Sequence, residues 1–224
     1  MNSRLLIFSI LGILMMQFCF SENIEEGKIY IVSNLTFQDA ISVKGIMSEN
    51  DIMLITDQNF LPKETENFLN NVSNKEIIIV GGNFVIKENV RKKIKEIAKL
   101  KNLTVKEIYG KEAEDTAFEL IKFKNFSNIN TIIIVNKNSV DDCFSASSIT
   151  SFLNFPIAYT EKEEIPNSTI NIIEKFNVKE IIIVGGEGII SKKVENVIKK
   201  YNVKISRKWG ITAKDTNEEV KKFL

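Results

Sequence analysis

Two glycine pairs are the strongest candidates for ligand binding in this 224-residue sequence. Gly81-Gly82 and Gly185-Gly186 each follow a short apolar run, and Ser191 follows the second pair where a helix is expected to begin. Backbone N–H groups at such a turn can bind a phosphate or another anion. The alternative, which we prefer, is structural: the glycines permit a tight strand-to-helix turn with positive φ, and Ser191 caps the helix.

Neither glycine pair completes a nucleotide-binding motif. No GK[ST] follows, as the P-loop requires, and the first pair continues as Asn83-Phe84 without the third glycine of the dinucleotide fingerprint. The sequence therefore gives little support to nucleotide binding.

Four more polar residues recur at matching places. Asp39 and Asp142 each follow an apolar run, near the carboxyl ends of strands where open parallel sheets keep their ligand crevices. They could contact a ligand or cap the helix that begins there, and we prefer the cap. Thr116 and Thr216 have no activating partner, so we expect contacts at a helix start or between repeats rather than nucleophiles. The candidate ligand-binding residues are therefore Asp39, Gly81, Gly82, Thr116, Asp142, Gly185, Gly186 and Thr216.

The composition argues against catalysis. The chain contains no histidine, which removes the most frequent general base near neutral pH and the commonest transition-metal ligand. Without a histidine to form a thiolate pair, Cys143 is expected to be a small buried side chain rather than a nucleophile. We therefore expect no catalytic residue, no metal site and no cofactor.

The charge pattern argues against nucleic acid as a partner. The formal net charge is +1 and the two signs are interspersed, so the sequence lacks a basic stripe that would neutralise many phosphates. Basic stretches such as 91–93 and 192–193 are expected to be solvated helix surfaces. Trp209, the only tryptophan, could stack on a sugar ring, but a core or inter-unit anchor is the preferred interpretation.

The N-terminus resembles a secretory signal. Arg4 precedes an apolar run that continues to Phe20, and the small residues Cys19 and Ser21 suit cleavage before Glu22. An uncleaved anchor is the main alternative, although a spanning helix usually needs about 20 apolar residues. Lipid attachment at Cys19 is not favoured because a bulky phenylalanine precedes it. We expect an exported chain with no membrane span after cleavage, located at the cell wall, the cell surface or the periplasm.

An internal repeat is the most informative feature of the sequence. Residues 75–82 read KEIIIVGG, and residues 179–186 repeat the same eight letters. Around these anchors FQDA matches VDDC, IMLIT matches PIAYT, and YGKEAEDTAFELI matches WGITAKDTNEEVKKF. A period near 100 residues indicates domain duplication rather than a short solenoid. We expect a signal peptide at 1–21, a first unit at 22–128 and a second unit at 129–224.

Each unit is expected to alternate strands with amphipathic helices. Continuous apolar runs at 29–33, 52–55 and 77–80 predict buried strands, as do 132–135 and 181–184 in the second unit. Apolar residues three and four apart follow them, and Pro62 and Pro166 suit the first turn of a helix. Parallel neighbours need helical crossovers, so we predict two tandem three-layer α/β units with mostly parallel sheets, packed against each other.

The order of these features resembles the cell wall binding repeat 2 family. The strand, VGG turn, amphipathic helix, short strand and G-x5-T segment occur twice, over nearly all of the mature chain. The matching residues include Asp39-Ala40, Asp142, Thr56, Thr160 and the segments 110–116 and 210–216. The resemblance implies a Rossmann-like or Toprim-like fold. It also implies a domain of bacterial surface proteins that holds an effector to anionic wall polymers without a covalent bond.

The sequence departs from the family pattern at several places. Family proteins resemble three tandem copies about a pseudo-threefold axis, whereas this chain has two, plus a segment from Trp209 that resembles the start of a third. The family's arginine after the G-x5-T glycine is Ala113 or Ala213 here, and a family glycine is Asn34 or Lys137. With no sequence left for an effector, we expect a binding module standing alone or a part of a larger assembly.

Three functions are therefore open. The first is a non-catalytic envelope module that binds an anionic glycopolymer. The second is a protein or enzyme that uses the glycine turns for a small phosphorylated ligand. The third is a structural homo-oligomer that completes a three-unit ring.

Overall fold

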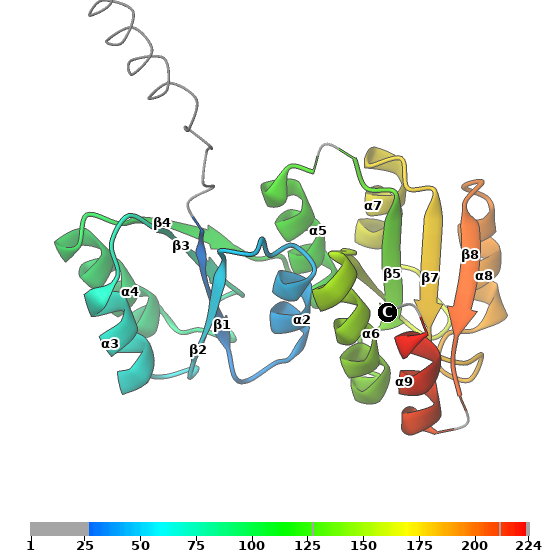
Figure 1. Cartoon of the computed structure of the whole chain (residues 1–224), viewed down its shortest axis with the longest axis horizontal. Coiled ribbons are helices and arrows are strands. Elements are labelled where there is room, and N and C mark those ends of the chain that lie inside the picture. Colours follow the sequence, from blue (N-terminus) through cyan, green and yellow to red (C-terminus); the bar gives the residue numbers. More distant parts are fainter. Residues whose placement is uncertain (1–26, 127, 211, 223–224) are drawn as a thin grey trace, which may run out of the picture.

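The computed structural model describes residues 27–126, 128–210 and 212–222, which form two similar α/β units (Figure 1). The expected signal peptide, residues 1–21, lies outside this part of the chain. The strands of the first α/β unit, called unit 1, are β1 (Ile29–Ser33), β2 (Ile52–Thr56), β3 (Glu76–Val80) and β4 (Thr104–Ile108). Its helices are α2 (Gln38–Lys44), α3 (Lys63–Asn71), α4 (Glu88–Leu100) and α5 (Ala113–Lys124).

Unit 2 repeats this order of elements. Its strands are β5 (Thr131–Asn136), β6 (Ile157–Thr160), β7 (Glu180–Val184) and β8 (Lys204–Lys208). Its helices are α6 (Val140–Leu153), α7 (Asn167–Lys175), α8 (Lys192–Lys199) and α9 (Ala213–Lys221). The segments predicted as strands and helices are thus confirmed, and α9 follows β8 as α5 follows β4.

Both sheets are parallel, and their strand orders are equivalent. The order is β2-β1-β3-β4 in unit 1 and β6-β5-β7-β8 in unit 2, with every pair parallel. The central strands β1, β3, β5 and β7 consist mainly of buried isoleucine and valine, because helices cover both of their faces. Helices α3 and α4 pack on one face of the first sheet, and α2 and α5 on the other. The three-layer prediction is therefore confirmed.

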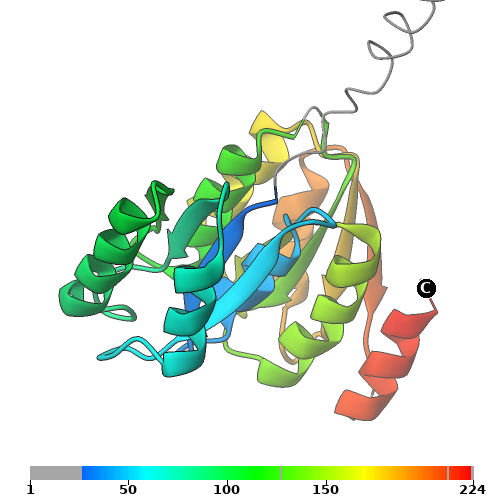
Figure 2. The same ribbon diagram turned by 60° about the vertical axis from the view of Figure 1, so that its left-hand side comes forward.

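Buried hydrophobic residues of the two units pack together in shared clusters. A single cluster of buried residues joins Tyr30 and Val32 of β1, Phe118 and Ile121 of α5, and Ile172 of α7. Helix α5 therefore serves both units, covering its own sheet and packing against α7 and β6 (Figures 1 and 2). The predicted packing of the units against each other is confirmed.

Polar contacts fix the position of unit 2 on α2. Tyr159 of β6 donates its hydroxyl proton to the carbonyl of Gln38 at 2.7 Å and accepts a hydrogen bond from Ser42. Burial raises the pKa of Tyr159 well above its usual value, so the hydroxyl stays protonated. Gln38 in turn donates its side-chain N–H to the carbonyl of Lys137.

Pro62 and Pro166 occupy the N-cap positions of α3 and α7, one residue before the first turn in which they were predicted. Their extended ψ turns the chain into the helix, where a missing N–H costs little.

Among the described residues no helix is both long and apolar enough to cross a membrane.

Candidate functional site

The glycine turns lie at the carboxyl end of β3 and of β7. Gly81 and Gly185 have φ values of +111° and +126°, which explains why glycine occupies both places. A Cβ on Gly81 would lie 2.9 Å from Oδ2 of Asp39, and one on Gly185 would lie 3.0 Å from Oδ2 of Asp142. The fold therefore brings each predicted aspartate directly against the glycine turn of its own unit.

These aspartates do not cap their helices, so the preferred interpretation from sequence was wrong. Phe37 is the N-cap residue of α2 and Ser139 that of α6, so Asp39 and Asp142 lie inside the first turn. From there each side chain extends toward the glycine turn instead of back to the helix N–H groups. Ser139 donates its hydroxyl to the Asp142 carboxylate at 2.7 Å. Ser191 does occupy the N-cap of α8, but its side chain makes no capping bond.

A carboxylate against the turn makes the turn a poor cradle for a phosphate. Burial raises the pKa of Asp39 to about 6, while a hydrogen bond with the Thr36 side chain opposes the shift. Near neutral pH a phosphate at Gly81 would meet this carboxylate at close range, and like charges repel strongly where water is excluded.

An arginine holds the carbonyl of the first glycine in both units. Arg91 of α4 donates to the carbonyls of Gly81 and Ile86, and Arg207 of β8 donates to the equivalent carbonyls of Gly185 and Ile190. Arg91 is only 1% exposed, which corrects its prediction as a solvated helix residue. Each guanidinium therefore fixes the shape of its glycine turn by binding the turn carbonyls.

The charged partners of these arginines are exchanged between the units. Arg91 on the helix pairs with Glu107 on β4 at 2.7 Å, whereas Glu195 on the helix pairs with Arg207 on β8 at 2.9 Å. Aligning the repeats on KEIIIVGG and on G-x5-T places 91 opposite 195 and 107 opposite 207. The two units thus use the same ion pair in opposite orientations.

Lysines on the helix support both carboxylates. Lys95 contacts Glu107 at 2.6 Å, and the equivalent Lys199 contacts Glu195 at 2.8 Å. Burial alone would raise the pKa of Glu107, but its contacts with Lys95 and Arg91 hold that pKa below its usual value. The hydrogen bond from Lys199, with a smaller contribution from Arg207, lowers the pKa of Glu195 in the same way.

The G-x5-T segment closes the loop between the last strand and the last helix of each unit. Thr116 accepts a hydrogen bond from the N–H of Gly110 at 3.0 Å, and Thr216 accepts one from Gly210 at 2.9 Å. A Cβ on either glycine would lie only 2.1 Å from the Cβ of the following aspartate, so no other residue fits. The predicted helix-start contact of both threonines is confirmed.

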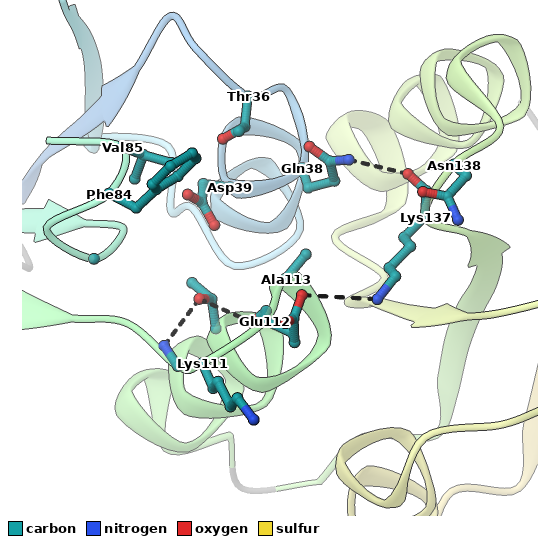
Figure 3. A pocket seen from close by; sticks show the side chains of 13 residues that line it. Thr36, Gln38, Asp39, Phe84, Val85, Lys111, Glu112, Ala113, Lys137 and Asn138 are labelled. Atoms are coloured by element: carbon teal, nitrogen blue, oxygen red, sulfur yellow. Dashed lines mark hydrogen bonds and ion pairs between the residues drawn. The ribbon is translucent and has the colours of Figure 1, made fainter. Parts of the chain in front are cut away.

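Cavity 1 lies at the carboxyl edge of the first sheet and reaches the second unit. Its volume is about 290 Å³, and its walls include Asp39, Gly82, Phe84, Lys111 and Thr116. Figure 3 shows Lys137 and Asn138, which follow β5, forming the wall opposite Asp39 and Phe84. Four of the eight predicted site residues belong to unit 1, and Asp39, Gly82 and Thr116 line this cavity, whereas Gly81 is not among its lining residues.

Lys137 joins the units at the edge of cavity 1. It lies 2.9 Å from Glu161, 3.3 Å from Glu114 and 3.9 Å from Glu112. Partial burial would lower the pKa of Lys137, but Glu161 and Glu114 raise it above its usual value. This lysine is therefore charged and already neutralised by its neighbours.

Cavity 2 occupies the equivalent place in unit 2. Its volume is about 700 Å³, and its walls include Asp142, Gly186, Gly188, Trp209 and Thr216. Trp209 is 51% exposed and lies against Gly186 of its own unit, so the prediction of a core or inter-unit anchor was wrong. The indole is held by a glycine backbone on one side and remains accessible from the cavity.

Cys143 is a buried residue of α6 with no sign of reactivity. Burial, with a contribution from the Asp142 charge, raises the pKa of its thiol to about 12. The prediction of a small buried side chain is confirmed.

The fold and the site define a class: tandem parallel α/β units in which a glycine turn, an aspartate and a G-x5-T loop surround a cavity. The family model described as Cell wall binding domain 2 (CWB2) matches residues 107–195, which span the boundary between the units. The resemblance to the cell wall binding repeat 2 family is therefore confirmed.

Two curated relatives come from Bacillus subtilis (strain 168). The chain is 28% identical over 167 residues to the N-acetylmuramoyl-L-alanine amidase LytC, covering 74% of this chain and 32% of that protein. It is 31% identical over 100 residues to the amidase enhancer, covering 45% of this chain and 14% of that protein. The chain thus matches about a third or less of the length of either relative.

Two solved structures share the fold. Cwp6 from Clostridium difficile has a TM-score of 0.78 at 23% identity, covering 88% of this chain and 31% of that chain. Cwp8 from the same organism has a TM-score of 0.76 at 26% identity, covering 88% and 33%. These structures show the same fold, and the family match supports a cell wall-associated module.

Proposed function

We propose that this chain is an exported, non-catalytic module that binds a glycopolymer of the bacterial envelope without a covalent bond. The observation that carries the proposal is the repeated cavity. The features shared by the two units, including an aspartate, a glycine turn and a G-x5-T loop, converge at the same sheet edge twice. A long polymer could engage both cavities at once, and rigidly linked weak sites bind more tightly than either site alone.

The anionic character of the polymer remains a prediction. Lys137 is occupied by three carboxylates, so contacts with anionic groups would fall to exposed lysines such as Lys111 at cavity 1. Exposed charge contacts weaken with salt because the Debye length falls below about 10 Å above 0.1 M. Salt-sensitive binding is therefore the expected signature. Export also remains a prediction, since the expected signal peptide lies outside the described residues.

A small phosphorylated ligand is the less favoured alternative. Asp39 and Asp142 place a carboxylate against each glycine turn, at the position where a phosphate would have to approach. The arginines that could neutralise a phosphate instead hold the turn carbonyls from inside the fold.

A homo-oligomer that adds a third unit is also less favoured, because α9 lacks the surface by which α5 holds unit 2. The α5 residues Ala117, Phe118 and Ile121 are buried in the shared cores. Their equivalents in α9 are polar and at least partly exposed: Asn217, Glu218 and Lys221.

Two more differences act in the same direction. Glu112 and Glu114, which bind Lys137, are replaced by Thr212 and Lys214. A Cβ on Gly45, the C-cap residue of α2, would lie 2.9 Å from the Thr150 methyl of unit 2, yet the equivalent residue in α6 is Ser148. The outer face of unit 2 is thus a poor acceptor for another unit docked in the same way, and we propose that the module is a monomer.

Co-sedimentation with protein-stripped envelopes tests the proposal. Residues 22–224 should sediment with envelopes from the source bacterium at low salt and be released at high salt. Light scattering should give the mass of a single chain in the same buffers. Thermal stabilisation by nucleotides or sugar phosphates, without envelope binding, would instead favour the phosphorylated-ligand alternative.

A further inference from the structure

The two cavities share one framework but differ at three places, so each serves as a comparison for the other. Phe84 at cavity 1 is 80% exposed, and its equivalent at cavity 2 is Gly188, which has no atom within 4 Å of the place a Cβ would occupy. Lys137 and Asn138 close one side of cavity 1, whereas every described residue that lines cavity 2 belongs to unit 2. Cavity 2 is also larger in volume, at about 700 Å³ against about 290 Å³.

The third difference is the aromatic residue on the second glycine. Tyr109 lies 3.7 Å from the Cβ position of Gly82, and Trp209 lies 3.3–3.8 Å from that of Gly186 through three atoms of the indole. Trp209 lines cavity 2, whereas Tyr109 is not among the residues that line cavity 1. The unit with the larger cavity thus also has the larger aromatic residue on its second glycine, and only there does this residue line the cavity.

Polar residues line cavity 2 together with Trp209, and the charged ones are acidic. Asp141, Asp142 and Glu187 line cavity 2 together with the hydroxyl residues Ser139 and Thr212, and its described lining contains no lysine or arginine. Glu187 is 3.2 Å from Lys192, an exposed lysine outside that lining. An anionic group would meet repulsion here, whereas hydroxyl donors and a cation would meet acceptors.

We propose that cavity 2 is a subsite for an amino-sugar ring carrying a free amine. The C–H face of the ring stacks on the indole of Trp209, its hydroxyls bond to Thr212 and Ser139, and its ammonium group lies near Asp141. The inference rests on the proposed function, because the ring belongs to the envelope glycopolymer, and it defines one chemical component of that polymer.

Trp209 is the only tryptophan in the chain, so its emission reports directly on this cavity. Titrating residues 22–224 with a glucosamine tetramer should shift the emission and saturate. The N-acetylated tetramer should bind about threefold or more weakly, since it lacks the ammonium group. Poly(glycerol phosphate) should leave the emission unchanged.

Variants read by calorimetry locate the site. Trp209→Ala should lose about tenfold or more in affinity for the glucosamine tetramer, Trp209→Phe should lose less, and Asp141→Asn should remove the preference for the free amine. Tyr109→Ala removes the equivalent aromatic residue of unit 1 and is the matched control, so it should bind as the original chain does. Circular dichroism checks that each variant is folded.

Two results would overturn the inference: no change in emission with either tetramer at millimolar concentration, or an equal loss of affinity in Tyr109→Ala. Co-sedimentation of the same preparation separates this failure from a failure of the proposed function. Envelope binding without a sugar response contradicts the amino-sugar subsite alone, and absence of envelope binding contradicts the proposed function.

Discussion

The exchanged ion pair beneath the glycine turns gives a demanding prediction about stability. In unit 1 the arginine is on α4 and the glutamate on β4, and in unit 2 the positions are reversed. Exchanging the charges in unit 1 with Arg91→Glu and Glu107→Arg copies the arrangement of unit 2. The new arginine on β4 should reach the carbonyls of Gly81 and Ile86, as Arg207 reaches those of Gly185 and Ile190.

The single variants set the scale of the effect. Arg91→Glu leaves two buried carbonyls without a donor and places a second carboxylate beside Glu107, where only Lys95 remains as a cation. Breaking a buried pair costs about 3–5 kcal/mol, and added repulsion places this variant at the upper end. For a chain of this size each kcal/mol corresponds to about 2–4 °C in Tm, so the loss is on the order of 10 °C or more. The double variant should recover to within about 1–2 kcal/mol of the original chain.

Urea denaturation followed by far-UV circular dichroism measures these differences. The matched control exchanges the exposed pair Lys92 and Glu96 on the same helix, 4.0 Å apart, which should change stability by less than about 0.5 kcal/mol. If the double variant in unit 1 is as unstable as Arg91→Glu alone, the two units do not use equivalent ion pairs and the reasoning fails.

Three further predictions concern single residues. Burial raises the pKa of Asp39 from 3.8 to about 6, so the folded chain binds this proton more tightly than the unfolded chain does. The free energy of unfolding should therefore fall by up to about 3 kcal/mol as the pH rises from about 4 to 6. Urea titrations across this range should show that Asp39→Asn lacks this pH dependence. Gly110→Ala should lower the free energy of unfolding by more than about 2 kcal/mol, because the new Cβ would lie 2.1 Å from the Cβ of Asp115. An unchanged Tm would show that the loop has room for this side chain. Tyr159→Phe should lower the free energy of unfolding by about 1–2 kcal/mol, because the Gln38 carbonyl loses its hydroxyl donor. Amide hydrogen exchange in α2 should become faster. Unchanged exchange would show that this contact does not stabilise the interface between the units.

The sequence was sufficient to predict the framework because its signals are local and repeated. Short continuous runs of isoleucine and valine are typical of strands covered on both faces, and the second copy of KEIIIVGG defines the duplication. The G-x5-T contact was also within reach, since Gly110 and Thr116 are only six positions apart at the start of α5.

The site details depended on exact boundaries and on long-range pairing. Asp39 was expected at the N-cap, but the N-cap residue of α2 is Phe37, two residues earlier in the chain, and sequence patterns locate helix ends only to about two residues. Arg91 lies beside Val90 on the buried face of α4, and its guanidinium donates to the carbonyl of Gly81. The basic sequence 91–93 therefore gave a wrong prediction that Arg91 is solvated. Residues 91 and 107 carry charges opposite to those of their equivalents 195 and 207. This exchange indicates the ion pair, but an alignment based on identical residues does not reveal it.

The most direct test of the central claim compares envelopes before and after extraction of their glycopolymer. A binding isotherm of residues 22–224 should show saturable retention on intact protein-stripped envelopes at low salt, and retention should disappear when the polymer is removed. Equal binding to extracted envelopes, or no binding to either preparation, would contradict the assignment of the chain as a glycopolymer-binding module.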